Sequence, residues 1–375
     1  MDFSLTDEQA MLADSVERFI TNDYDFDTRM KIAEGDAPFS QDVWRAFAEM
    51  GWTAMLFDEQ DGGFNGGAVE LMLIMEQLGR GLVVEPFLAN VVLAGGVIKR
   101  APSGTRRSEL IDGIISGDLQ AALACDEPQS RGNAADISTR AEKSAEGYVL
   151  NGRKALVLNG GAADYIVVPA RTAGPQTDES GITLFVVAAD SEGLVRKSYA
   201  TVDAHSAAEL ELNDVQVSAD DVLGSVDGGY ALLRDTIADA VLAVCAESMG
   251  IQRAMLDKTV DYSKNRVQFG VPIGSFQALQ HRMVDMLVCC EETRSLLYWA
   301  AMLLADGDPK SSRALCALKH QVGTAGRHVA KEAVQLHGGM GVTWELDIAH
   351  YFKRQASIQL QFGNADQHLE QFAAG

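Results

Sequence analysis

The sequence of 375 residues has few cysteines and no cysteine pair with the spacing of a metal site. Its cysteines number five, which is odd, and none stands in a CxxC motif, so we expect neither a disulfide framework nor a zinc site. A reducing compartment such as the cytoplasm fits this usage. The five are Cys125, Cys245, Cys289, Cys290 and Cys316.

Basic residues are also scarce. Lysine and arginine total 31 against 53 aspartates and glutamates, which gives a net charge of −22. Nucleic acids and anionic membranes would repel such a chain, so we expect neither as a partner. The sequence contains no run of roughly 18 apolar residues, the length that a helix needs to span a bilayer. Residues 1–6 lack the basic start and apolar core of a signal peptide, so we expect an unsecreted, cytoplasmic protein.

What the chain does have is enough apolar sequence, 47%, for two or three domains of about 150 residues each. Residues 1–117 have helical periodicity and predict an all-α domain. Thr6 and Gln9 form a capping box that opens a first helix. Further helices are expected over 41–50 and 69–82, with a loop over 58–63.

Residues 118–225 change to short alternating segments, which predict a small β-barrel or β-sandwich domain. Strands are expected over 147–150, 155–158, 165–168 and 182–187. Between the first two, Asn151-Gly152 predicts a two-residue hairpin, because both central positions of a type I′ turn need positive φ.

Residues 226–375 return to long helical periods. Helices over 231–262, 276–304 and 314–336, with a shorter one from residue 349, predict an antiparallel four-helix bundle, and the whole chain an α+β fold. Two of these helices carry apolar residues on more than one face, which indicates a partner surface. These residues are Leu242, Val244, Met249, Met255, Val322 and Val334.

Several local motifs occur in a characteristic order. This order resembles the acyl-CoA dehydrogenase family over nearly the whole chain, and the resemblance implies the family's three-domain fold. The motifs are Phe3 to Gln9, Asp58 to Gly63, Leu150 to Lys154 followed by Asn159-Gly160, Arg266 with Phe269-Gly270 and Phe276-Gln277, and Gln335 with Gly338, Gly339 and Gly341.

The resemblance implies FAD as cofactor, held in part by residues that serve the flavin of a neighbouring subunit. The chemistry suits a dinucleotide, since glycines permit close backbone approach and an arginine offers a forked phosphate donor. Alternatively, Gly338 and Gly339 form a helix C-cap and Arg266 is a solvated residue. The implied FAD-binding residues are Arg266, Phe269, Gln277, Gln335, Gly338, Gly339, Gly341 and Asn364.

The reacting centre of the family is not matched. Oxidation of an acyl-CoA needs a carboxylate to remove the α-proton. The position of the family's glutamate is Phe362 here, and its alternative site falls on Ala240. Asp239 remains a candidate base, about 100° of helix turn from the expected direction. We expect Asp239, Glu247 and Asp366 to be solvated or ion-paired.

The flavin-ring side also departs from the family's pattern. The family's Trp-x-Thr positions, whose threonine bonds the flavin ring, are Leu156 and Leu158 in this chain, and leucine offers no donor. The loop over 126–136 differs in composition from its family counterpart. We expect His281, His337 and His368 to be structural.

Three functions remain open. Residues 83–88 and 276–281 resemble small-subunit chains of mixed α2β2 tetramers, of the type that acts on pimeloyl-CoA or steroid side-chain acyl-CoA. The chain would then act with a partner that carries the glutamate, with electron-transfer flavoprotein as the implied acceptor. The alternatives are a self-sufficient homo-oligomeric flavoenzyme, either a dehydrogenase or an oxidase or monooxygenase, and a scaffold subunit without flavin.

Overall fold

The computed structural model describes residues 4–374, which form two compact units. One, here called the bundle unit, comprises the described residues of Met1–Lys31, Gly67–Val83 and Val241–Gly375. The other, the sheet unit, comprises Ile32–Gly66 and Val84–Ala240. The helical ends and β-rich middle confirm the α+β fold predicted from the sequence.

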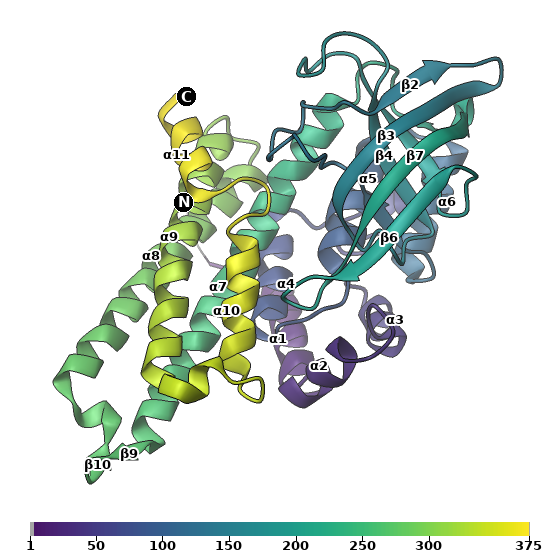
Figure 1. Cartoon of the computed structure of the whole chain (residues 1–375). Helices are drawn as coiled ribbons and strands as arrows, with labels where there is room; N and C mark the ends of the chain where they lie inside the picture. Colours follow the sequence, from purple (N-terminus) through teal and green to yellow (C-terminus); the bar gives the residue numbers. More distant parts are fainter. Residues whose placement is uncertain (1–3, 375) are drawn as a thin grey trace. The chain divides into compact units, whose positions relative to one another are not determined.

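The bundle unit is built on long helices that run side by side (Figure 1). Helix α8 packs on α9, and α9 packs in turn on α10 and α11. The three long helices expected from periodicity are confirmed, each within a few residues of its predicted ends. The helices are α1 (Asp7–Asn22), α2 (Phe26–Ala33, whose last two residues belong to the sheet unit), α4 (Ala68–Arg80), α7 (Tyr230–Asn265, in this unit from Val241), α8 (Gln277–Ala305), α9 (Ser311–His337), α10 (Asp347–Ile358) and α11 (Ala365–Ala374).

Local sequence explains where α1 begins. The Thr6 side chain accepts a hydrogen bond from the Gln9 backbone N–H at 3.2 Å, and the Gln9 side chain accepts one from the Thr6 N–H at 3.0 Å. The capping box is therefore confirmed.

Two glycines let α4 and α7 approach each other backbone to backbone. A Cβ on Gly250 would lie 1.8 Å from the Glu76 carbonyl oxygen, and one on Gly79 would lie 2.1 Å from the Glu247 carbonyl oxygen. No side chain can occupy either position, so this helix crossing depends on glycine.

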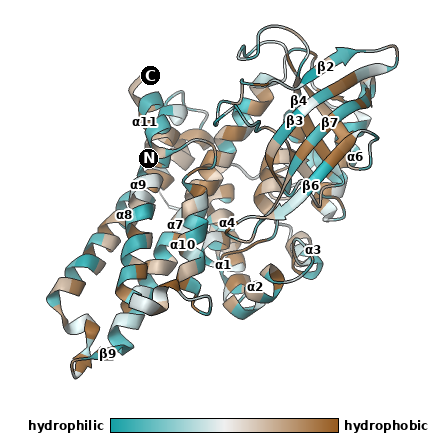
Figure 2. Cartoon of the chain, viewed as in Figure 1, coloured by the Kyte–Doolittle hydropathy of each residue, from teal (hydrophilic) through white to brown (hydrophobic). Residues whose placement is uncertain are grey.

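The apolar residues that indicated a partner surface are mostly internal, so that interpretation was wrong. Five of the six are buried within this chain, and only Val334 is half-buried. One group of exposed apolar residues lies on α8, on the residue just before it and on the short hairpin of β9 (Val267–Gln268) and β10 (Val271–Pro272), and the hairpin end of the bundle is marked in Figure 2. They are Val267, Phe269, Val271, Phe276, Val284, Leu287 and Val288.

The sheet unit contains one mixed eight-stranded sheet. Its strand order is β6-β7-β3-β2-β4-β5-β8, with β1 paired parallel to β4. Strands β4 and β5 are buried along almost their whole length, as their continuous apolar sequence requires. The strands are β1 (Ala121–Leu123), β2 (Arg140–Lys143), β3 (Gly147–Leu158), β4 (Tyr165–Arg171), β5 (Ile182–Ala188), β6 (Leu194–Ala200), β7 (Ser206–Ser218) and β8 (Val222–Leu223).

Short helices accompany this sheet. The segment before β1 includes a seven-residue π-helix, whose Asn90 amide accepts from the Ala121 N–H at 2.9 Å and donates to the Leu119 carbonyl at 3.0 Å. The helices are α3 (Gln41–Glu49), the π-helix η2 (Leu88–Ala94), α5 (Gly95–Arg100) and α6 (Thr105–Ser116), with 3-10 turns at Glu59–Asp61 and Ala219–Asp221.

The hairpin predicted at Asn151-Gly152 is wrong. Residues 147–158 form the single strand β3, which pairs with β7 on both sides of this dipeptide. The register shifts between Leu150 and Gly152, so the dipeptide marks a β-bulge. Two successive residues with positive φ occur instead in the β9–β10 turn, at Phe269 (54°) and Gly270 (82°).

Candidate cofactor-binding and catalytic sites

The β9–β10 hairpin carries one group of predicted FAD-binding residues. Arg266 follows the last residue of α7, and its backbone carbonyl accepts from the Ile273 N–H at 2.8 Å, which closes the hairpin. The hairpin turn presents Phe269 with 92% of its surface exposed. The ring of Phe269 meets Phe276 edge to face at 6.2 Å, so these two rings support each other outside the hydrophobic core.

Three predicted donors have no partner among residues 4–374. The side chains of Arg266, Gln277 and Gln335 are exposed, and none of them makes a hydrogen bond or ion pair among residues 4–374. A guanidinium and two amides in this state are available to phosphate, ribose or adenine atoms of a ligand.

The three predicted glycines differ in what surrounds them. Gly338 and Gly339 end α9, and a Cβ on either would meet nothing within 4 Å. A Cβ on Gly341 would lie 2.5 Å from the Val334 carbonyl oxygen. Open space at the first two positions suits a group that approaches the backbone, whereas Gly341 is required by the chain's own packing.

An aromatic contact brings the hairpin that follows Arg266 close to the glycines that follow α9. The Tyr262 ring stacks on the His337 ring at 4.4 Å, and its hydroxyl donates to the His337 carbonyl at 3.4 Å. The end of α7, which leads to Arg266, thus adjoins the end of α9, which leads to Gly338. His337 has the structural role expected from the sequence, and its burial lowers its pKa.

Asn364 is set apart from this group. Its side-chain oxygen accepts from the backbone N–H groups of Asp366 and Gln367 at 3.0 and 2.9 Å, so Asn364 is the N-cap of α11. Figure 1 shows α11 at the opposite end of the bundle from β9–β10. Any contact of Asn364 with a cofactor would use its Nδ2 group.

The positions predicted for the flavin ring lie on β3. Leu156 has φ of 48° within a second register shift, and its N–H donates to Glu209 Oε1 at 3.3 Å. The same oxygen accepts from the Tyr199 hydroxyl at 3.0 Å, and burial together with Glu209 raises the pKa of Tyr199 to about 12. The backbone is held in a defined bulge, but Leu156 and Leu158 supply no side-chain donor.

The loop over 126–136 is anchored by a buried ion pair that the sequence did not reveal. Glu127 Oε1 accepts from Lys154 Nζ at 2.7 Å, and both side chains are fully buried. The other carboxylate oxygen accepts from the Ser138 N–H at 2.8 Å and from Gln129 Nε2 at 2.9 Å. Partners 27 residues apart leave no local spacing signal from which the pair could be predicted.

The candidate acids are engaged or solvated. Asp239 Oδ2 accepts from Arg100 Nη2 at 2.6 Å, and both side chains are largely buried. Glu247 forms a buried two-pronged pair with Arg354, with Oε2 to Nη2 at 2.7 Å. Asp366 is exposed and has no ion pair among the described residues. Phe362 and Ala240, the residues predicted at the family's two glutamate positions, carry no titratable group.

Three family sequence models, which together cover most of the chain, decide its family. The acyl-CoA dehydrogenase N-terminal, middle and C-terminal domains match residues 6–118, 122–215 and 227–375. The chain belongs to the acyl-CoA dehydrogenase family. The predicted resemblance and the three-domain fold are thereby confirmed, and FAD is the cofactor of this flavoprotein family.

Individual relatives and solved structures match this chain over nearly their full length. The short-chain specific acyl-CoA dehydrogenase of Megasphaera elsdenii is 29% identical over 98% of each chain. The ChsE4-ChsE5 complex from Mycobacterium tuberculosis contains a chain that is 28% identical, with a TM-score of 0.89 over 100% of this chain and 98% of the other. PigA with FAD and proline is 25% identical, with a TM-score of 0.92 over 100% and 98%.

In this acyl-CoA dehydrogenase family member, the residues predicted to hold the adenosine side of FAD are open to a ligand. The space over Gly338 and Gly339 and the unpartnered side chains of Arg266, Gln277 and Gln335 are the groups that would hold the dinucleotide. On the ring side, the chain offers a formed backbone bulge with apolar side chains. The predicted residues are thus compatible with the nucleotide part of the cofactor.

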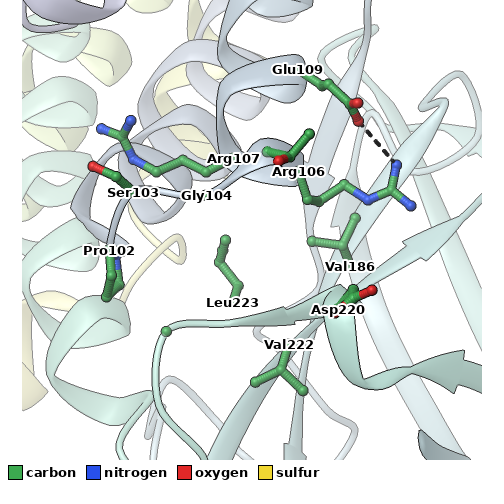
Figure 3. A pocket seen from close by; sticks show the side chains of 12 residues that line it. Pro102, Ser103, Gly104, Arg106, Arg107, Glu109, Val186, Asp220, Val222 and Leu223 are labelled. Atoms are coloured by element: carbon green, nitrogen blue, oxygen red, sulfur yellow. Dashed lines mark ion pairs between the residues drawn. The ribbon is translucent and has the colours of Figure 1, made fainter. Parts of the chain in front are cut away.

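A separate cavity of about 650 Å³ in the sheet unit offers no comparable site. It lies between residues 102–109 and the strands near Val222 (Figure 3). Arg106, which lines it, pairs with Asp221 at 2.9 Å and with Glu109 at 3.5 Å, and Arg107 pairs with Asp61 at 2.6 Å. Its cations are thus neutralised by the chain itself.

Residues 4–374 contain neither a membrane-spanning helix nor a metal-binding cluster. No helix there is long and apolar enough to cross a bilayer. No cluster of three or more histidine, cysteine, aspartate or glutamate side chains is placed to hold a metal ion within the same residues.

Proposed function

We propose that this chain is a subunit of a mixed acyl-CoA dehydrogenase, that it supplies the adenosine-side contacts of FAD, and that a complementary chain carries the catalytic base. The observation that carries the proposal is that none of the three candidate base positions, 239, 240 and 362, has a carboxylate free to accept a proton. Phe362 and Ala240 stand at the positions predicted for the base, and the remaining candidate Asp239 is ion-paired with Arg100. A base must be free to take the α-proton.

The donor groups support the cofactor part of the proposal. Arg266 and Gln277 project from a hairpin and a helix start whose apolar neighbours are exposed. A second subunit that covers these apolar residues would also bring its own FAD to the donors. When bound, FAD supplies the hydride acceptor of the α,β-dehydrogenation. The residues of this chain would bind and orient it.

The partner and substrate follow from resemblance. The match to a chain of the ChsE4-ChsE5 complex and the small-subunit motifs over 83–88 and 276–281 favour an α2β2 tetramer that acts on an acyl-CoA. We propose a steroid side-chain or dicarboxylic acyl group, electron-transfer flavoprotein as acceptor, and the cytoplasm as location.

The test is turnover of acyl-CoA with an artificial electron acceptor. The chain purified alone should show none, and a preparation co-purified with a complementary family member should be active. Turnover by the isolated chain would contradict the proposal. If that turnover were lost in Asp239→Asn but kept in Asp366→Asn, a self-sufficient enzyme with Asp239 as base would be the better reading.

A further inference from the structure

The loop between α10 and α11 contains two successive residues with left-handed backbone. Phe362 has φ of 55° and Gly363 has φ of 95°. Glycine adopts such angles readily, but a phenylalanine adopts them only where its surroundings impose them. Something outside the loop must therefore hold Phe362 in this conformation.

Lys319 of α9 is one such group. Its side chain is completely buried, and Nζ donates to the carbonyl oxygens of Ile358 at 3.0 Å and Gly363 at 2.9 Å. No carboxylate pairs with Lys319 among residues 4–374. Burial lowers its pKa, and the neighbouring thiol of Cys245 acts in the opposite direction. A buried amine that binds only carbonyl groups ties the end of α10 to the far side of the loop.

His368 of α11 holds Phe362, which lies between Ile358 and Gly363, the two residues that Lys319 binds. Its Nε2 lies 2.8 Å from the Phe362 carbonyl oxygen, and because a carbonyl only accepts, Nε2 carries the proton. The His368 ring is buried and would be 3.0 Å from a Cβ at position 363. Two carbonyl groups of the loop and one at the end of α10 thus receive donors from two buried side chains.

We infer that Lys319 is a positioning residue, which together with His368 fixes the loop backbone so that side chain 362 has one defined placement. The functional part of this inference rests on the proposed function, in which position 362 is that of the missing base. The hydrogen bonds that would hold a base at position 362 are then all present, although the residue at this position is phenylalanine. A carboxylate introduced at 362 would meet a loop that is already formed.

Hydrogen exchange tests the positioning role without any reaction. Lys319→Met keeps the apolar stem and removes the donor, and Lys331→Met is the matched control at an exposed site of the same helix. In the FAD-loaded protein, amides of 359–364 should exchange at least ten-fold faster in Lys319→Met and unchanged in Lys331→Met. Unchanged exchange in Lys319→Met would overturn the inference. If that variant does not fold, His368→Leu should produce the same local increase, and no increase would overturn it.

A second measurement tests whether the placement of side chain 362 suits a catalytic base. In a FAD-loaded assembly whose complementary chain has its own catalytic carboxylate replaced by the amide, Phe362→Glu should give the ability to exchange the α-hydrogen of an acyl-CoA with D2O, and Phe362→Gln should not. Adding Lys319→Met to Phe362→Glu should lower kcat for this exchange at least ten-fold with little change in KM, whereas adding Lys331→Met should not. An equal rate with and without Lys319 would overturn the inference. If Phe362→Glu exchanges nothing while the amides respond as expected, the positioning role stands and the proposed base position fails.

Discussion

Lys154 and Glu127 form a 2.7 Å ion pair in which neither side chain is exposed to solvent. The pair joins β3 to the loop over 126–136, and the Ala155 N–H adds a hydrogen bond of 2.9 Å to the Asp126 carbonyl. Residues 154–156, next to the predicted ring side, are thus fixed by partners outside their own strand.

Lys154→Met should destabilise the protein by about 3–5 kcal/mol, because it leaves a buried carboxylate without its cation. The double variant Glu127→Gln/Lys154→Met should recover at least half of this loss, since a glutamine oxygen still accepts from Ser138. Urea unfolding of both variants beside the parent measures the difference. If Lys154→Met were as stable as the parent, the ion pair would have to be accessible to water.

The same pair predicts loss of stability in acid. Burial alone would raise the pKa of Glu127, but Lys154 and the hydrogen bonds from Ser138 and Thr139 outweigh it and lower that pKa to about 2. A lowered pKa in the folded state stabilises at pH values above the unfolded value of 4.5, and this contribution falls as the pH drops from 4.5 towards 2.

The measurement is the free energy of unfolding at several pH values between 6 and about 3. The parent should lose stability more steeply below pH 4.5 than Glu127→Gln/Lys154→Met, which lacks this titration. Parallel curves for the two proteins would contradict the assigned pKa.

The glycines at the end of α9 should separate cofactor binding from folding. Gly339→Ala should leave stability within about 0.5 kcal/mol, because its Cβ meets nothing within 4 Å, yet it should lower FAD content if the cofactor occupies that space. Gly341→Ala should cost about 1–3 kcal/mol through its clash with the Val334 carbonyl. Thermal unfolding and flavin absorbance of the two variants decide between these roles.

Arg266→Ala should weaken FAD binding in the assembled protein by about 1.5–3 kcal/mol, the contribution of a charge-assisted hydrogen bond, without loss of stability. Lys264→Ala, two residues earlier and also exposed, is the control and should bind FAD normally. Equal FAD occupancy in parent and Arg266→Ala at limiting FAD would exclude a phosphate contact.

Periodicity predicted the long helices well, because α7, α8 and α9 each repeat an apolar face over many turns. It failed at Asn151-Gly152, where pairing of β3 with β7 along its length outweighs the turn preference of two residues. Phe269-Gly270 gave no turn signal, since a phenylalanine with positive φ is fixed by the hairpin and not by its own preference. Tertiary context decided both positions.

The site could be predicted only where its motifs are local. Gly338-Gly339 and Arg266 have the open surroundings that the motif suggested. Asn364 has an N-cap role that position counting could not show. The contacts of Lys319 with residues 358 and 363 join segments about 40 residues apart, and no spacing rule links them.

Native mass spectrometry of the assembled protein with its flavin count tests the subunit proposal most directly. If this chain supplies adenosine-side donors and lacks a base, it should assemble with a complementary chain as two plus two, with about two FAD molecules per tetramer. A stable homotetramer of this chain with four FAD molecules would contradict the proposal.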